Sequence, residues 1–263
     1  MSKTRRALLM LLALAVIKMP LDSLLAALLP DASVNMLPVC IAGAAVSVLL
    51  LGVPAWRMRP WTSPRMVREE TAWVGVAVGA GMGALCRLAF TPVDTVWQGW
   101  MNLAPEEMAA PESLPAAMVC VLTLAIIPAV TEEAFFRGAL LTSLLDGSRR
   151  ITAIVVTALA FTLMHGNTAN LPSLLGTALL LTLLMLRSGN IIAPMAMHLV
   201  YNLTAFVRAE TTLWGSLPGG AALAAAALWC CIRREQYAHP PMKRQDGLIA
   251  GAALAVLALQ YFV

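Results

Sequence analysis

The sequence predicts an all-α fold, a polytopic membrane helix bundle of about eight or nine spans. Hydrophobic residues make up 60% of the 263 residues and charged residues only 12%, about half of the ~25% of ordinary soluble domains. So few charged side chains cannot cover a soluble protein that carries this much apolar area. The composition therefore excludes a soluble enzyme, a disordered chain and a nucleic-acid-binding domain. The apolar runs are also continuous, whereas the strands of a membrane β-barrel alternate.

Nine apolar stretches define the expected helices. A helix needs ~20 residues to cross a bilayer core of ~30 Å. The stretches cover residues 7–29, 36–56, 72–92, 116–145, 151–166, 171–187, 190–208, 216–232 and 248–262. The first follows a basic N-terminus but is too long for a signal peptide, so we expect it to be retained as a span. No repeat or long linker divides the chain, which predicts one integral membrane domain over residues 1–263.

The basic residues predict the orientation of these spans. Lysines and arginines gather before the first stretch and in every second connection, and the opposite connections carry mostly acidic residues. Basic loops remain in the cytoplasm, so we expect a cytoplasmic N-terminus, and an outer C-terminus if the ninth stretch spans. Short loops without an organellar targeting sequence favour a bacterial inner membrane. The polar segment 93–115 contains two tryptophans and is expected to lie at the outer interface.

Ionisable residues inside the apolar stretches need an explanation, because a charge at mid-membrane costs at least ~2.5–3.5 kcal/mol. Lys18 and Asp22 are four residues apart, and we interpret them as a local structural pair. Glu133 and Arg137 have the same spacing and are expected to form an ion pair. Glu132 is left without a local partner. A carboxylate in that situation can accept a proton near neutral pH.

Two further stretches carry polar groups at a similar depth. His165 ends the fifth stretch, and His198 and Asn202 lie four residues apart on one face of the seventh. Counted at about 1.5 Å per residue from the cytoplasmic ends, these groups and Glu132 all lie about 12–21 Å deep. We therefore predict a buried polar active-site cavity that contains all four.

The chemistry of this set suits the hydrolysis of an amide bond. A glutamate assisted by a histidine can deprotonate water and later protonate the leaving amine. A neutral histidine and an asparagine amide can donate hydrogen bonds to the oxyanion. The same atoms of Glu132, His165 and His198 could instead hold Zn²⁺ with a bound water. The residue pattern alone leaves both mechanisms open, although the usual His-Glu-x-x-His zinc helix does not occur.

Three motifs in this order resemble those of the CPBP intramembrane protease family, the CAAX-protease and bacteriocin-processing group. The pattern Glu-Glu-x-x-x-Arg occurs at 132–137, Phe-x-x-x-His at 161–165 and His-x-x-x-Asn at 198–202. The resemblance covers a core of residues 116–208, and the flanking spans carry no family motif. It implies an all-helical fold similar to type II CAAX prenyl endopeptidases, with the active site within the membrane.

The resemblance also implies roles for individual residues. Glu132 and His165 would activate water, His198 and Asn202 would bind the oxyanion, and Glu133 with Arg137 would support the site. It favours a glutamate mechanism without a cofactor over a zinc mechanism. We expect a membrane-anchored peptide or protein as substrate, the lipid bilayer as surroundings and no nucleic-acid partner. A non-catalytic bacteriocin-immunity or scaffold protein and a proton-coupled transporter are the alternatives.

Overall fold

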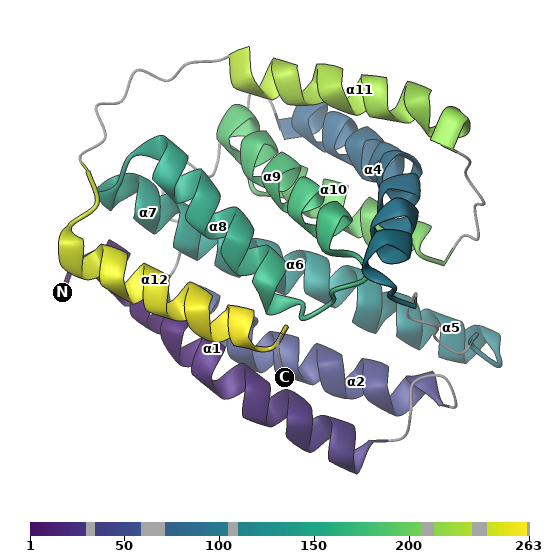
Figure 1. Ribbon diagram of the computed structural model, residues 1–263, viewed down its shortest axis with the longest axis horizontal. Helices are drawn as coiled ribbons and strands as arrows, with labels where there is room; N and C mark the ends of the chain where they lie inside the picture. The colour runs from purple at the N-terminus through teal and green to yellow at the C-terminus, as the bar shows by residue number, and fades with distance from the viewer. Residues whose placement is uncertain (30–34, 59–71, 105–109, 207–212, 233–240, 262–263) are drawn as a thin grey trace.

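The fold is a bundle of helices, and this confirms the predicted all-α class. The computed structural model describes residues 1–29, 35–58, 72–104, 110–206, 213–232 and 241–261. No β-strand occurs within these ranges (Figure 1). Five of the described helical segments are long and apolar enough to cross a membrane, so the chain is an integral membrane protein. They are Lys3–Leu28, Met36–Met58, Trp73–Met101, Leu114–Gly147 and Leu171–Ser188.

The first half of the chain supplies three long helical segments. The first is α1 (Lys3–Leu28). The second runs from α2 (Met36–Ser47) through the π-helical turn η1 (Val48–Gly52) into α3 (Val53–Met58). The third is α4 (Ala72–Met101), which continues beyond the boundary predicted at residue 92. The segment 93–101 is therefore helical, and its C-terminal end is held by tertiary contacts that the sequence pattern does not reveal.

The fourth long segment is a continuous helix with two π-helical interruptions. It comprises α5 (Leu114–Val121), η4 (Leu122–Ile126), α6 (Ile127–Glu133), η5 (Ala134–Leu141) and α7 (Thr142–Gly147). The first interruption immediately precedes Pro128, which has no N–H to donate to the preceding turn. The second follows Glu132 and Glu133 directly, and π-helical turns of this kind occur frequently at functional sites.

Shorter helices follow in the second half of the chain. These are α8 (Arg150–Met164), α9 (Leu171–Ser188), α10 (Ile192–Thr204), α11 (Leu213–Ile232) and α12 (Arg244–Leu259). Every predicted apolar stretch thus contains a helix. α8 and residues 216–231 are apolar but shorter than a full span. The centre of the bundle lies around η5, where Phe135, Phe136 and Arg137 are fully buried.

Close contact between α4 and α10 brings His198 into this centre. Gly79 and Gly83 are one turn apart on α4, and α10 crosses them with its backbone. A Cβ atom at Gly79 would lie 2.3 Å from the carbonyl oxygen of Ala193, and one at Gly83 would lie 2.3 Å from that of Met197. Only glycine allows two membrane helices to approach this closely.

Candidate active site

Glu132 and Glu133 end α6 at the centre of the bundle and face different surroundings. Neighbouring residues on a helix point ~100° apart. The side chain of Glu133 is completely buried, whereas that of Glu132 keeps 14% of its surface exposed. This difference separates a fully enclosed carboxylate from one that lines a cavity.

Glu133 is the centre of a buried network of charged groups. Its Oε1 accepts a hydrogen bond from Arg137 Nη1 at 2.8 Å, which confirms the predicted ion pair. The same oxygen lies 2.8 Å from Nδ1 of His198 on α10. Arg137 also donates to the carbonyl oxygen of Ala178 on α9 and lies 4.4 Å from the Phe161 ring. The network therefore joins α6, η5, α8, α9 and α10.

His165 is the C-cap residue of α8, and its ring orientation is fixed by its own helix. Nδ1 lies 2.8 Å from the carbonyl oxygen of Phe161, one turn earlier. A carbonyl oxygen can only accept, so Nδ1 carries the proton and donates. The ring also packs against the Phe161 ring with a centroid separation of 4.6 Å. Nε2 of His165 is thereby turned away from α8.

The two imidazoles converge on Glu132. Its Oε2 lies 3.6 Å from Nε2 of His165 and 4.0 Å from Nε2 of His198. This oxygen is buried and has no hydrogen-bond partner among the described residues. Both imidazoles already use Nδ1 for another contact. Three polar atoms from α6, α8 and α10 thus face one another across a space without a direct hydrogen bond.

The fourth predicted residue, Asn202, lies one turn beyond His198 on α10 and is half-buried. Within the described part of the chain, its side chain forms no hydrogen bond with the other site residues. The structure therefore brings Glu132, His165 and His198 into contact distance. It places Asn202 on the same helix without joining it to them.

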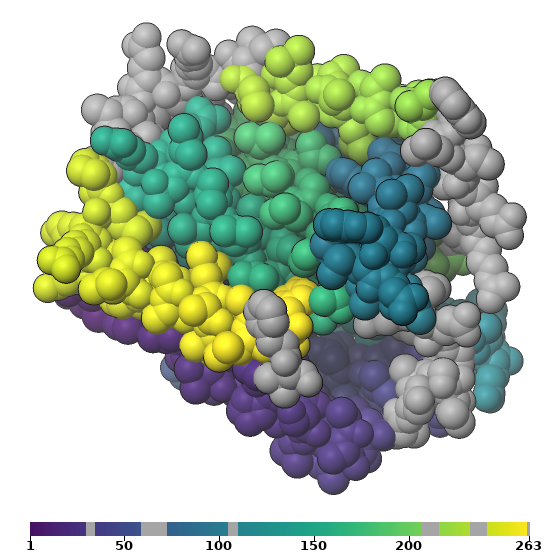
Figure 2. Space-filling view, in the orientation of Figure 1, coloured from purple at the N-terminus to yellow at the C-terminus, as the bar shows by residue number. Residues whose placement is uncertain are grey.

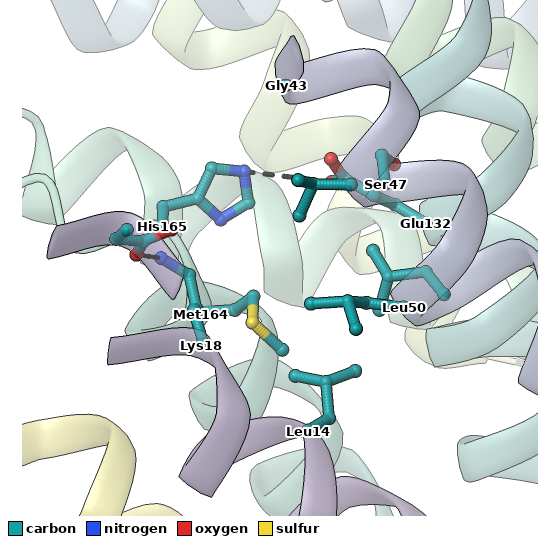
Figure 3. A pocket seen from close by; sticks show the side chains of 11 residues that line it. Leu14, Lys18, Gly43, Ser47, Leu50, Glu132, Met164 and His165 are labelled. Atoms are coloured by element: carbon teal, nitrogen blue, oxygen red, sulfur yellow. Dashed lines mark hydrogen bonds and ion pairs between the residues drawn. The ribbon is translucent and has the colours of Figure 1, made fainter. Parts of the chain in front are cut away.

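A cavity of about 200 Å³ opens in front of Glu132 and His165 (Figure 3). Its walls come mainly from α1 and from α2 with η1. Figure 3 shows Lys18, Met164 and His165 on one side, with Ser47, Leu50 and Glu132 facing them. The lining residues are Leu14, Lys18, Asp22, Gly43, Val46, Ser47, Leu50, Leu51, Glu132, Met164 and His165. The cavity is thus mostly apolar, with its polar groups near the two predicted catalytic side chains.

Sequence reasoning assigned Lys18 and Asp22 to a structural pair and did not connect them to the site. The structure confirms their ion pair but also places both on the cavity wall. Their position in the middle of an apolar helix was the available signal, since charges within spans usually face a polar interior. Ser47 was also missed. Its hydroxyl lies 2.6 Å from that of Thr131, which joins the C-terminal end of α2 to α6 beside Glu132.

A zinc site is the alternative that the residue pattern leaves open. The alternative mechanism requires Glu132, His165 and His198 as ligands. Among the described residues, no group of three His, Cys, Asp or Glu side chains has an arrangement that could hold one metal ion. We derive no step through a metal.

Part of the chain matches one family model. Residues 114–204 match the family model described as "Type II CAAX prenyl endopeptidase Rce1-like". The match confirms the resemblance seen in the sequence, over a segment that covers less than half of the chain. No curated protein and no solved structure gives a significant match. The matched segment contains Glu132, His165, His198 and Asn202 but excludes α1, α2, α4 and α12.

Proposed function

We propose that this protein is an intramembrane endopeptidase that hydrolyses a peptide bond of a membrane-associated peptide or protein. One observation carries the proposal. The unpaired Oε2 of Glu132 lies near Nε2 of both His165 and His198, beside a cavity within the helix bundle. The family match supports protease activity at the level of the family.

Glu132 and His165 are the proposed water-activating pair. In the tautomer set by Phe161, Nε2 of His165 carries a lone pair, and the Glu132 carboxylate is also an acceptor. A water molecule that donates to both would be oriented for attack. One of its protons passes to Glu132 while its oxygen bonds to the substrate carbonyl carbon. The proton then passes from Glu132 to the amine nitrogen as the C–N bond breaks.

His198 is the proposed donor to the oxyanion, and Glu133 fixes the orientation of its ring. Its Nδ1 must donate to Glu133, because a carboxylate can only accept. Nε2 can then donate only if the ring is doubly protonated. With a protonated His198, the positive charges of Arg137 and His198 balance the negative charges of Glu132 and Glu133. Neutrality of the whole group lowers the cost of burying it.

Asn202 is the second proposed oxyanion donor. Its amide lies one helical turn from His198 on the same helix, so both side chains project from one face of α10. An amide N–H₂ group donates without changing its own charge, which suits a site where negative charge develops during the reaction. The remaining network, Glu133 and Arg137, would hold His198 in place.

The bilayer surrounds the proposed site. We propose a bacterial inner membrane and a cytoplasmic N-terminus, on the basis of the basic residues in alternate connections. The cavity walls, α1 and α2 with η1, also carry exposed apolar side chains such as Ile17 and Leu49. These helices would face lipid on one side and the cavity on the other, which suits a membrane-anchored substrate.

The proposal is tested by the substitution Glu132→Gln, which keeps the shape of the side chain and removes its basicity. Native cells carrying the wild type or the variant at equal abundance would be compared by mass spectrometry of membrane peptides. We expect the product to fall at least ~100-fold, the lower range for loss of a general base. The matched control is Glu112→Gln, because Glu112 is exposed and lies before α5.

The outcomes separate the proposed function from its alternatives. Identical peptide profiles, with the cellular phenotype retained by the variant, would overturn the protease and favour an immunity or scaffold role. Solute flux into vesicles that depends on Glu132 would favour a transporter. Once a substrate is known, treatment of the purified protein with a chelator is expected to leave the cleavage rate unchanged. A loss restored by Zn²⁺ would contradict the glutamate mechanism.

A further inference from the structure

The C-terminal end of α8 requires hydrogen-bond donors from outside the helix. The last four carbonyl groups of a helix have no partner within it, and α8 ends at Met164, directly before His165. The Phe161 carbonyl accepts from the His165 side chain at 2.8 Å. The Thr162 carbonyl accepts from the His165 backbone N–H at 3.3 Å. The orientation of His165 thus depends on how this last turn is held.

The other donors come from the opposite end of the chain. Gln260 Nε2 donates to the carbonyl oxygen of Leu163. The hydroxyl of Tyr261 donates to the carbonyl oxygen of Thr162 at 3.2 Å. Both residues follow α12, which lies outside the segment matched by the family model. Neither residue lines the cavity, so any influence on the reaction must pass through α8.

Helix α12 holds Gln260 and Tyr261 beside the last turn of α8. It lies between α1 and α8 on one face of the molecule (Figure 2). At its beginning, Asp246 is buried and accepts from Arg5 of α1 at 2.9 Å. Arg5 also donates to the neighbouring Gln245 at 2.8 Å. These contacts fix α12 at one end, and Gln260 with Tyr261 fix it to α8 at the other.

The chain turns sharply where Gln260 makes contact. Gly166 follows His165 and has φ +64°, a conformation that favours glycine. A Cβ atom at this glycine would lie 3.1 Å from Oε1 of Gln260. The Gln260 side chain therefore packs against the backbone on the C-terminal side of His165 and donates to the carbonyl on its N-terminal side.

We propose that Gln260 and Tyr261 are positioning residues for His165. By satisfying the Leu163 and Thr162 carbonyls, they keep the last turn of α8 closed and leave the Phe161 carbonyl to the His165 Nδ1–H group. Nε2 of His165 then stays directed at Glu132. This inference rests on the proposed function for its effect on catalysis, whereas the effect on the His165 ring does not depend on it.

The test combines two substitutions. Gln260→Met keeps the length of the side chain but removes its hydrogen-bond donor, and Tyr261→Phe removes one hydroxyl. The chain has three histidines, so nitrogen NMR of histidine-labelled protein in nanodiscs can resolve them, and His165→Gln assigns the signal. We expect the wild-type His165 ring to carry its proton on Nδ1 and to have an unprotonated Nε2. In the double variant, we expect a mixture of tautomers. The matched control is Leu259→Ala, because this neighbouring side chain is exposed.

The kinetic readout is the split between kcat and KM on the substrate found for the wild type. A misplaced catalytic group lowers turnover by about 10- to 100-fold, and we expect KM to stay unchanged because neither residue reaches the cavity. A His165 signal identical to that of the wild type in a folded double variant would overturn the proposal. If the double variant does not fold, Tyr261→Phe alone gives the same comparison. A wild type without peptidase activity would refute the proposed function, and the His165 signal would still decide this inference.

Discussion

Glu133 is a fully buried carboxylate shared by two basic groups, Arg137 and His198. Taking charged groups out of water is costly, and only close partners with good hydrogen bonds offset that cost. Even so, Glu133 Oε2 and Arg137 Nε have no hydrogen-bond partner among the described residues. Such an arrangement contributes little net stability, but it sets the position of His198. We infer that its main role is to orient the His198 ring.

The substitution Arg137→Met would leave Glu133 buried beside His198 without its main counter-charge. Removing one partner of a buried ion pair destabilises a protein by about 3–5 kcal/mol. We therefore expect a clear fall in the melting temperature of the purified protein in detergent, together with loss of peptide cleavage.

A matched control for this prediction is Arg187→Met, the same chemical change at an arginine whose guanidinium lies 4.2 Å from the Trp229 ring. Loss of a cation–π contact of this kind costs about 1 kcal/mol. Equal melting temperatures for the two variants would show that the Glu133 network does not depend on Arg137.

At the scale of elements, the position of His198 depends on the contact of α10 with α4. The carbonyl of Met197, the residue before His198, lies where a Cβ atom of residue 83 would be. The substitution Gly83→Ala must therefore push α10 outward. Overpacking of this kind costs about 1–3 kcal/mol, and it would also separate His198 from Glu133.

We expect Gly83→Ala to lower peptide cleavage by about 100-fold, the effect of a misplacement near 1 Å, as measured by turnover of the purified protein. The control is Gly81→Ala, because a Cβ atom at Gly81 meets no atom within 4 Å. Equal activity of the two variants would mean that the close approach of α4 and α10 does not position the site.

A second contact of α4 supports the loop that follows His165. Trp97 Nε1 donates to the carbonyl oxygen of Thr168 at 2.9 Å, and Gln98 Nε2 donates to that of Ala169 at 3.1 Å. Asp94 accepts from the backbone N–H of Ser173 in the first turn of α9. These contacts explain why α4 extends beyond its apolar stretch. Polar side chains near its C-terminal end form hydrogen bonds with backbone groups of the α8–α9 connection and of the first turn of α9.

At the scale of the whole molecule, the distribution of charge predicts how the chain lies in the membrane. The N-terminus is basic, and the connection before α5 is acidic. Three predicted spans separate them, so we expect them on opposite sides of the membrane. In a background where the exposed Cys231 is replaced by alanine, cysteines would be introduced by Ser2→Cys and Ser113→Cys. In intact cells, we expect a membrane-impermeant maleimide to label the second position and not the first.

The opposite labelling pattern would contradict a cytoplasmic N-terminus. Labelling of the first position only after permeabilisation would agree with the prediction. Labelling at both positions in intact cells would show that the chain adopts two orientations.

Part of the site could be predicted from the sequence because it depends on spacing within one helix. The pairs Glu133–Arg137 and Lys18–Asp22 follow from residues four apart, and both are confirmed. The helical segments follow equally from continuous apolar runs, because a backbone in lipid must satisfy its own hydrogen bonds. The three motifs identified the segment that the family model matches. The catalytic roles of Glu132, His165, His198 and Asn202 stay predictions.

The tertiary structure decided which atoms from different helices meet. No sequence spacing shows that His198 contacts Glu133, that α1 and α2 form the cavity walls, or that Gln260 and Tyr261 reach the end of α8. These contacts join residues far apart in the chain, and they depend on how closely each pair of helices can pack. The membrane class, the helices and the candidate catalytic groups follow from the residue pattern alone. Packing between helices decided how the candidate catalytic side chains are arranged. It sets the distances between residues of different helices, which the periodicity within one helix does not determine.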